Sequence, residues 1–216
     1  MDMQNTMSEG FWNFSIRVYR KPDVSQCGLS LQDLYGLDVN LLLFACWHAR
    51  SSGLCELALV EKALAFSSNW ADHVVKPLRG ARRWMKTQTQ RQTQTENNLA
   101  KDFHSLREQI KTLELQCEKF QQNTLESLVS RRGLSLSVEM QIASAAYNLH
   151  YILLSAANPQ PLSLSLPLRD LLITLILSAL DQDPDDDALQ QVVSRELNAQ
   201  SSGAPGVRIC ESLPSA

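Results

Sequence analysis

Basic residues are concentrated between Lys76 and Arg91, where the chain has six lysines and arginines and no acidic residue. A helix through this segment, turning about 100° per residue, separates its side chains into an apolar face and a basic face. The apolar face carries Trp70, Val74, Leu78, Ala81 and Met85, and the basic face carries Lys76, Arg79, Arg83 and Lys86. Cations beside an aromatic ring suit phosphate contacts and base stacking. We therefore predict a partner-binding face of Lys76, Arg79, Arg82, Arg83, Trp84 and Lys86.

Two interpretations of this face stay open. A charge run on one side of a helix is commonly only its solvated side. If the face binds, its partner is an acidic protein, RNA or single-stranded DNA, or an anionic lipid surface. A zipper-type DNA-binding protein is disfavoured, because Pro77 and Gly80 interrupt the continuous helix that such a protein needs. Pro77 is expected to kink the helix or to begin a new one near Lys76.

Three polar residues bracket the start of another predicted helix. Asp38 and Asn40 stand at the entrance to the apolar run VNLLLFACWHAR, and Gln32 lies just upstream. This trio could line a small pocket or accept a partner's backbone groups. Helix capping also accounts for Asp38, and Gln32 and Asn40 could satisfy backbone groups at the turn.

The remaining candidates for chemistry lack the spacing that a known site requires. The eight glycines form no GxGxxG, P-loop or GxSxG motif, and the five cysteines include no CxxC pair. The four histidines are far apart, and the aspartates between 181 and 187 fail the EF-hand pattern. These aspartates are interpreted as helix N-terminal charges, with Asp183 as the cap and Pro184 first in the helix. We predict no catalytic residue, no metal site and no cofactor, and reduced thiols in a cytosolic core.

The composition predicts an all-α protein. Leucine occurs 35 times against 11 valines and 7 isoleucines, so most of the apolar content comes from a good helix former. The net charge of −3 disfavours a chain that coats nucleic acid along its whole length. The N-terminus lacks the pattern of a secretory signal, and the longest apolar runs are about half the roughly 20 residues that a membrane span needs.

Apolar periodicity predicts the helices that position these residues. Helices are expected over 11–19, 22–35, 39–52, 54–67, 69–86, 97–120, 138–157, 167–180 and 184–198, and the one beginning near Val39 is apolar nearly all round and belongs at the centre. Two heptad patterns, one over 99–120 and one over 138–152, predict an antiparallel helical hairpin within a multi-helix bundle. They can close within one chain or, if left exposed, form a homo-oligomer.

The organisation along the chain is expected as follows. Residues 1–8 and 199–216 are predicted to be disordered, and 9–198 to form one helical bundle. The bundle divides into an N-terminal part (9–86), a polar segment (87–96), the heptad hairpin (97–157) and C-terminal helices (167–198). The polar segment is either a linker or a solvated helical extension.

Three phrases carry a resemblance to a known family: FWNFSIRVY, LQDLYGLDVNLLLFACW and VVKPLRGARRWMK. The chain resembles an uncharacterised bacterial family of small all-helical proteins, a domain of unknown function, over residues 11–120 and less closely to about 155. The resemblance implies a soluble, bacterial, all-helical protein and no activity, cofactor or catalytic residue. It leaves open whether the helices after residue 160 pack on the bundle.

These observations together predict a non-catalytic helical interaction or adaptor protein in the cytoplasm, with a basic helix face for an anionic partner. One alternative is a nucleic-acid accessory protein that binds RNA or single-stranded DNA. A second alternative is a helical enzyme whose pocket lies near Gln32, Asp38 and Asn40.

Overall fold

The computed structural model describes residues 9–91, 98–130, 133–156 and 164–201. All regular structure in these ranges is helical, so the all-α prediction is confirmed. The elements are α1 (Phe11–Tyr19), α2 (Pro22–Tyr35), α3 (Val39–Ser52), α4 (Leu57–Trp70), a π-helical turn η1 (Ala71–Val75), α5 (Lys76–Arg91), α6 (Asn98–Ser127), α7 (Val138–Ala156), α8 (Leu166–Ala179) and α9 (Asp187–Ser201). The disorder predicted for 1–8 lies outside the described residues, as does the predicted tail beyond Ser201.

Helix α3 is the centre of the molecule, as its composition predicts. It contacts α1, α2, α4, α6, α7 and α8, and all its residues from Leu41 to Ala49 are buried. Helix α2 ends at Gly36, whose φ of 67° is the left-handed conformation that glycine adopts without a Cβ penalty. Asp38 then begins α3 by accepting a hydrogen bond from the Asn40 backbone N–H at 2.9 Å.

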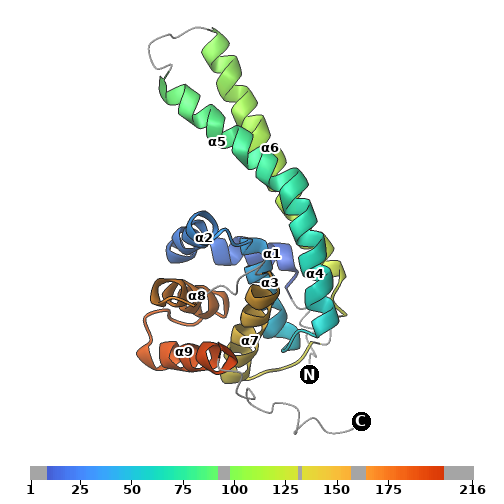
Figure 1. Cartoon of the computed structure of the whole chain (residues 1–216), viewed down its shortest axis with the longest axis vertical. Helices are drawn as coiled ribbons and strands as arrows, with labels where there is room; N and C mark the ends of the chain where they lie inside the picture. The colour runs from blue at the N-terminus through green and yellow to red at the C-terminus, as the bar shows by residue number, and fades with distance from the viewer. Residues whose placement is uncertain (1–8, 92–97, 131–132, 157–163, 202–216) are drawn as a thin grey trace, which may run out of the picture.

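The molecule has a body and an arm (Figure 1). The body contains α1–α4, α7–α9 and the C-terminal part of α6, and the arm is α5 with the part of α6 beside it. In the body, α8 packs on α2, α3 and α7, while α9 packs on α7 and α8. The helices after residue 160 therefore belong to the body core.

The helical hairpin consists of α5 and α6, whereas the sequence predicted a hairpin of α6 and α7. Helix α6 packs along α5 and η1, whereas α7 packs against α3, α9 and α4. The reason is chemical: α7 buries Ile142, Ala145, Leu149 and Ile152 among apolar helices, while the inward face of α6 includes Glu114 and Gln121. The predicted seam on α6 is also only half covered, because Leu106, Leu113 and Phe120 are exposed.

Two boundaries near the predicted sites also differ from expectation. Helix α5 continues through Arg91, so the described part of the polar segment is helical extension. Helix α9 begins at Asp187, and its cap is Asp186, whose Oδ1 accepts from the N–H groups of Ala188 and Leu189. Asp183 instead accepts from the Asp185 N–H within the preceding turn, which is why it does not cap the helix.

Candidate interaction site

The basic segment lies on one long rod made of α4, η1 and α5. The π-helical turn of η1 directly precedes Lys76 and Pro77, where a break was predicted. Proline has no N–H and its ring crowds the carbonyl four residues earlier, so a local change to wider i→i+5 spacing accommodates it. A π turn also takes one extra residue, which rotates the following side chains by about 100° relative to an uninterrupted α-helix.

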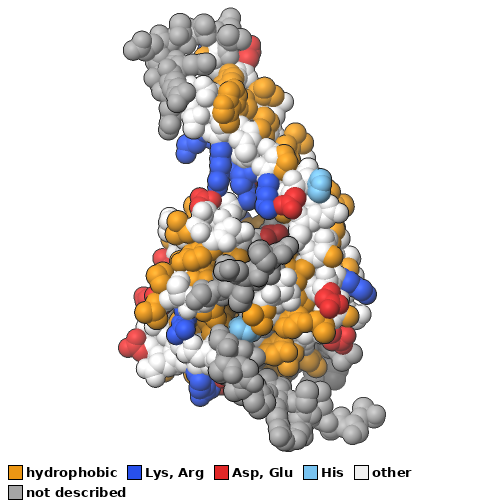
Figure 2. Space-filling view, viewed as in Figure 1, with side chains coloured by type: hydrophobic (Ala, Val, Ile, Leu, Met, Phe, Trp, Pro, Cys, Tyr) orange, Lys and Arg blue, Asp and Glu red, His pale blue; other side chains and the backbone are white. Residues whose placement is uncertain are grey.

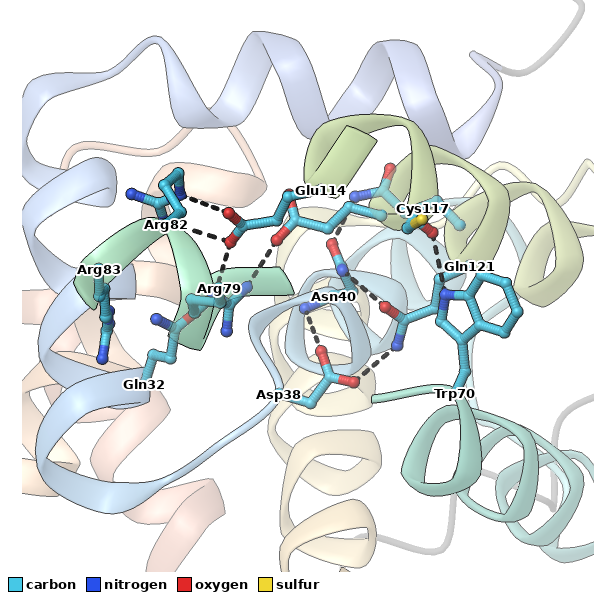
Figure 3. Close-up of polar contacts among 12 residues, drawn as sticks. Gln32, Asp38, Asn40, Trp70, Arg79, Arg82, Arg83, Glu114, Cys117 and Gln121 are labelled. Atoms are coloured by element: carbon cyan, nitrogen blue, oxygen red, sulfur yellow. Dashed lines mark hydrogen bonds and ion pairs between the residues drawn. The ribbon is translucent and has the colours of Figure 1, made fainter. Parts of the chain in front are cut away.

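Two of the predicted surface cations point inward, toward α6. Arg79 Nε donates to Glu114 Oε1 at 2.8 Å, and its Nη2 donates to Glu118 Oε1 at 2.6 Å. Arg82 Nε donates to Glu114 Oε2 at 2.5 Å (Figure 3). The side chains of Arg79, Arg82 and Glu114 are 19%, 23% and 7% exposed. These four residues, Arg79, Arg82, Glu114 and Glu118, form the arm ion cluster, which joins α5 to α6.

Electrostatics within the arm ion cluster favour ionised groups at its centre. Burial alone would raise the pKa of Glu114, but hydrogen bonds from Arg82 and Arg79 outweigh it and lower the pKa. The pKa of Arg79 is raised, because hydrogen bonds and charges from Glu114 and Glu118 outweigh its desolvation. At Glu118, burial is the largest effect and raises the pKa despite the attraction of Arg79. Glu114 is therefore the carboxylate on which the cluster depends.

Three further basic residues of α5, Lys76, Arg83 and Lys86, remain at the surface. Lys76 pairs with Asp72 on its own rod, and Arg83 Nη2 pairs with Asp33 Oδ1 of α2 at 2.5 Å. The hydrogen bond from Arg83 is the largest cause of the lowered pKa of Asp33. Lys86 is exposed and has no acidic partner among the described residues. Of the cations predicted on the basic face, Arg79 is thus mostly buried against α6, whereas Lys76 and Arg83 are exposed and paired with carboxylates.

We call these residues, Lys76, Arg83 and Lys86, the basic row. Figure 2 shows lysine and arginine side chains in a row along the arm, where it overhangs a hollow beside the body. Trp84 is 60% exposed, but it directly follows Arg83, so its side chain points about 100° away from Arg83 around α5. Leu34 of α2, which follows Asp33, is 74% exposed. Exposed apolar side chains are therefore present on both helices that the Arg83–Asp33 pair joins.

Two members of the predicted polar trio form a clamp between α3 and α6. Gln121 Nε2 donates to Asp38 Oδ2 at 2.6 Å, Asn40 Nδ2 donates to Gln121 Oε1 at 2.9 Å, and Gln122 Nε2 donates to Asn40 Oδ1 at 2.6 Å (Figure 3). Burial raises the pKa of Asp38. Gln32 is not part of the clamp, since its amide donates to Asp33 at 3.3 Å. The helix-capping interpretation of Asp38 is confirmed.

Sequence reasoning missed the acidic and amide residues of α6. Glu114, Gln121 and Gln122 are buried polar residues, and the first two are seven residues apart. Glu114 and Gln121 continue a seven-residue repeat that starts at Arg107. Each residue of this polar repeat directly follows a residue of the predicted apolar seam, Leu106, Leu113 or Phe120. This polar repeat could have identified the inward face of α6 from the sequence. The apolar heptad pattern beside it predicted instead that the leucines would face inward.

The remaining candidates serve the fold. His48 Nδ1 lies 3.1 Å from the Gly53 carbonyl oxygen, and burial lowers its pKa. Cys27, Cys46, Cys55 and Cys117 are free thiols, and burial raises the pKa of the first three to about 12. Within the described part of the chain, no group of three or more His, Cys, Asp or Glu side chains could hold a metal ion. None of the helices described there has both the length and the apolar character of a membrane span.

Fold and site together define an all-helical protein in which polar side chains join helices to one another. The chain belongs to the protein family of unknown function DUF2390, whose model matches residues 10–125, so the predicted family resemblance is confirmed. No curated protein and no solved structure matches the chain. The match covers α1–α5 and nearly all of α6, whereas α7, which covers α3 in the body, lies beyond it.

Proposed function

We propose that the protein is a non-catalytic helical interaction module that binds an acidic, amphipathic protein segment under the arm. The observation that carries this proposal is the exposed basic row of Lys76, Arg83 and Lys86 on α5. Exposed Trp84 lies on the same helix, and exposed Leu34 lies on α2, which Arg83 contacts through Asp33. Arg79 and Arg82 act indirectly, because their pairing with Glu114 holds α5 in position.

The carboxylates that already pair with the basic row can be replaced by carboxylates of a partner. The ion pairs Lys76–Asp72 and Arg83–Asp33 join exposed groups, and such pairs contribute little to stability. A partner's carboxylates can therefore replace Asp33 and Asp72 at small cost. Trp84 and Leu34 offer apolar area for the same partner, since exposed aromatic residues are frequent anchors of protein interfaces.

Charge distribution favours a protein segment over a polynucleotide. Asp33 and Asp72 interrupt the positive surface, so a phosphate backbone would meet two carboxylates along its path. The chain also has a net charge of −3, which does not attract a polyanion over long distances. The free cysteines support a reducing compartment, and we place the protein in the cytoplasm on that basis.

The test is fluorescence anisotropy with a labelled 15-residue peptide rich in glutamate and leucine, at low salt. The triple substitution Lys76→Glu, Arg83→Glu and Lys86→Glu should weaken binding at least about 10-fold, because three attractive contacts become repulsive. The matched control reverses Arg20, Lys62 and Arg195 and should retain binding. Arg20 is an exposed cation just after α1, and Lys62 and Arg195 are exposed cations of α4 and α9. Equal loss in the two triple variants would contradict a specific site.

A second variant is expected to gain affinity. Asp33→Asn removes the carboxylate that competes for Arg83, so the peptide should bind about 2-fold to 3-fold more tightly. A single-stranded RNA of similar length is titrated in parallel over roughly 50–200 mM salt. Tighter binding of the RNA than of the peptide would replace the proposal with the nucleic-acid alternative, and binding of neither would overturn both.

A further inference from the structure

The outer side of α6 carries a regular apolar stripe whose side chains remain about half exposed. Leu106, Leu113 and Phe120, called the outer stripe, are 50%, 49% and 52% exposed. They are spaced seven residues apart, so they lie on one face of the helix. Figure 2 shows apolar side chains exposed along the arm. Phe120 extends this surface onto α4, because its ring centroid lies 4.8 Å from that of Trp70.

We propose that a second copy of this chain covers the outer stripe, with the two α6 helices antiparallel. The arm is a pair of antiparallel helices, and two such pairs complete a four-helix bundle. Leu113 is the midpoint of the outer stripe, with Leu106 and Phe120 equally far on either side. An antiparallel copy therefore places Leu113 against Leu113 and Leu106 against Phe120, as a twofold axis requires.

The flanks of the outer stripe are compatible with a copy of themselves. Ser105, Gln109, Thr112 and Gln116 are exposed and uncharged, and they lie within one turn of the stripe. With Leu113 on the twofold axis, Gln109 falls opposite Cys117 and Gln116 falls opposite Ile110, so no like charges meet near the centre. The exposed charges Asp102 and Lys119 lie toward the two ends of the stripe, and depletion of charge at the centre is typical of the core of a protein interface.

The size of α6 fits a weak, concentration-dependent contact. Its 30 residues make a rod about 45 Å long and about 10 Å wide. The footprint of such a rod is roughly 450 Å², about half of the ~800 Å² per partner that a standard interface buries, which puts this contact in the weak class. This face is distinct from the basic row of α5, so self-association does not depend on the proposed peptide binding.

The test is the molar mass of the full chain in solution, measured by light scattering after size exclusion at roughly 100 μM. We expect twice the 24.2 kDa mass of the chain for the wild type. Leu113→Glu should give a monomer with unchanged helicity, because it places two carboxylates against each other at the twofold axis. Leu154→Glu on α7 is the matched control, since Leu154 is also 49% exposed, and it should remain a dimer.

Disulfide trapping tests the direction of the two helices in a background that carries both Cys117→Ser and Cys210→Ser. Leu113→Cys alone should form a covalent dimer on oxidation, whereas Leu106→Cys should do so only together with Phe120→Cys. A monomeric wild type would overturn the proposal, as would a dimer that survives Leu113→Glu. Efficient linkage of Leu106→Cys alone would show a parallel pair and overturn the antiparallel arrangement.

Discussion

The body and the arm use opposite kinds of residues at their helix contacts. In the body, α3 buries Phe44, Leu43 and Trp47 among the apolar faces of its neighbours. In the arm, α5 and α6 meet through Arg79, Arg82 and Glu114, and apolar side chains of α6 face outward. Apolar burial supplies stability without direction, whereas ion pairs with fixed geometry select one alignment of two helices. The body is therefore expected to determine stability, and the arm ion cluster to determine where the arm lies.

The largest effect is expected from the body core. Phe44→Ala should lower the free energy of unfolding by about 3–5 kcal/mol, because it leaves a cavity beneath a fully buried ring. Urea denaturation followed by circular dichroism measures the change. Leu154→Ala, at an exposed position of α7, is the control and should change stability by less than about 0.5 kcal/mol. A loss below about 1 kcal/mol at Phe44 would mean that α3 is not the centre of stability.

A smaller and more local effect is expected from the arm ion cluster. Glu114→Gln removes the carboxylate that both guanidiniums share, and should cost about 2 kcal/mol because Arg82 loses its acidic partner in a half-buried site. Hydrogen exchange should become faster in α5 and the facing part of α6, while α3 stays protected.

The matched control for that substitution is Glu108→Gln, which changes a more exposed carboxylate of the same helix. It should leave exchange in α5 unchanged. Equal acceleration of exchange in α3 and α5 after Glu114→Gln would show that the arm and the body unfold together, and the contrast between them would not hold.

The smallest effect is expected from an ionic contact at the surface of the body. Asp181 accepts from Arg17 and Lys21 through Oδ1 and from Arg50 through Oδ2. Burial would raise its pKa, but the hydrogen bonds from Lys21 and Arg50 and the charge of Arg17 lower it to about 2. Because Asp181 is 41% exposed, solvent screening should limit the loss in Asp181→Asn to less than about 1 kcal/mol at pH 7.

The pH dependence of Asp181 has a definite sign. The folded pKa of about 2 is below the ordinary value of 3.8, so its contribution is present above pH 4 and is lost as the pH falls toward 2. Urea denaturation of the wild type and of Asp181→Asn should therefore give curves that converge between pH 4 and pH 2. A difference that stays constant down to pH 2 would contradict an ionic origin.

Local sequence signals predicted much of the fold but few of the helix partners. The bounds of α1 and α2, the stop at Gly36 and the cap at Asp38 were predicted because each depends on residues within a few positions of one another. The pairing of α6 with α7 was wrong. A heptad pattern shows that one face of a helix is apolar, but it does not show which other helix covers that face.

The candidate site, like the fold, has some features that local sequence signals predicted and others that they did not. The basic character of α5 and the position of Trp84 could be predicted from spacing alone. The inward orientation of Arg79 and Arg82 could not, because it depends on Glu114, which lies 35 residues after Arg79. Asp38 was predicted as a cap, but its second bond, to Gln121 of α6, joins residues 83 positions apart.

The sequence by itself determined that this chain is helical, that α3 is buried and that α5 carries a cationic side, because composition and periodicity act over one or two helical turns. Only the tertiary structure decided which cations are neutralised, which apolar residues of α6 remain exposed and that α5 is the hairpin partner of α6. Those outcomes depend on contacts between residues far apart in the chain, and the spacing within one helix contains no information about them.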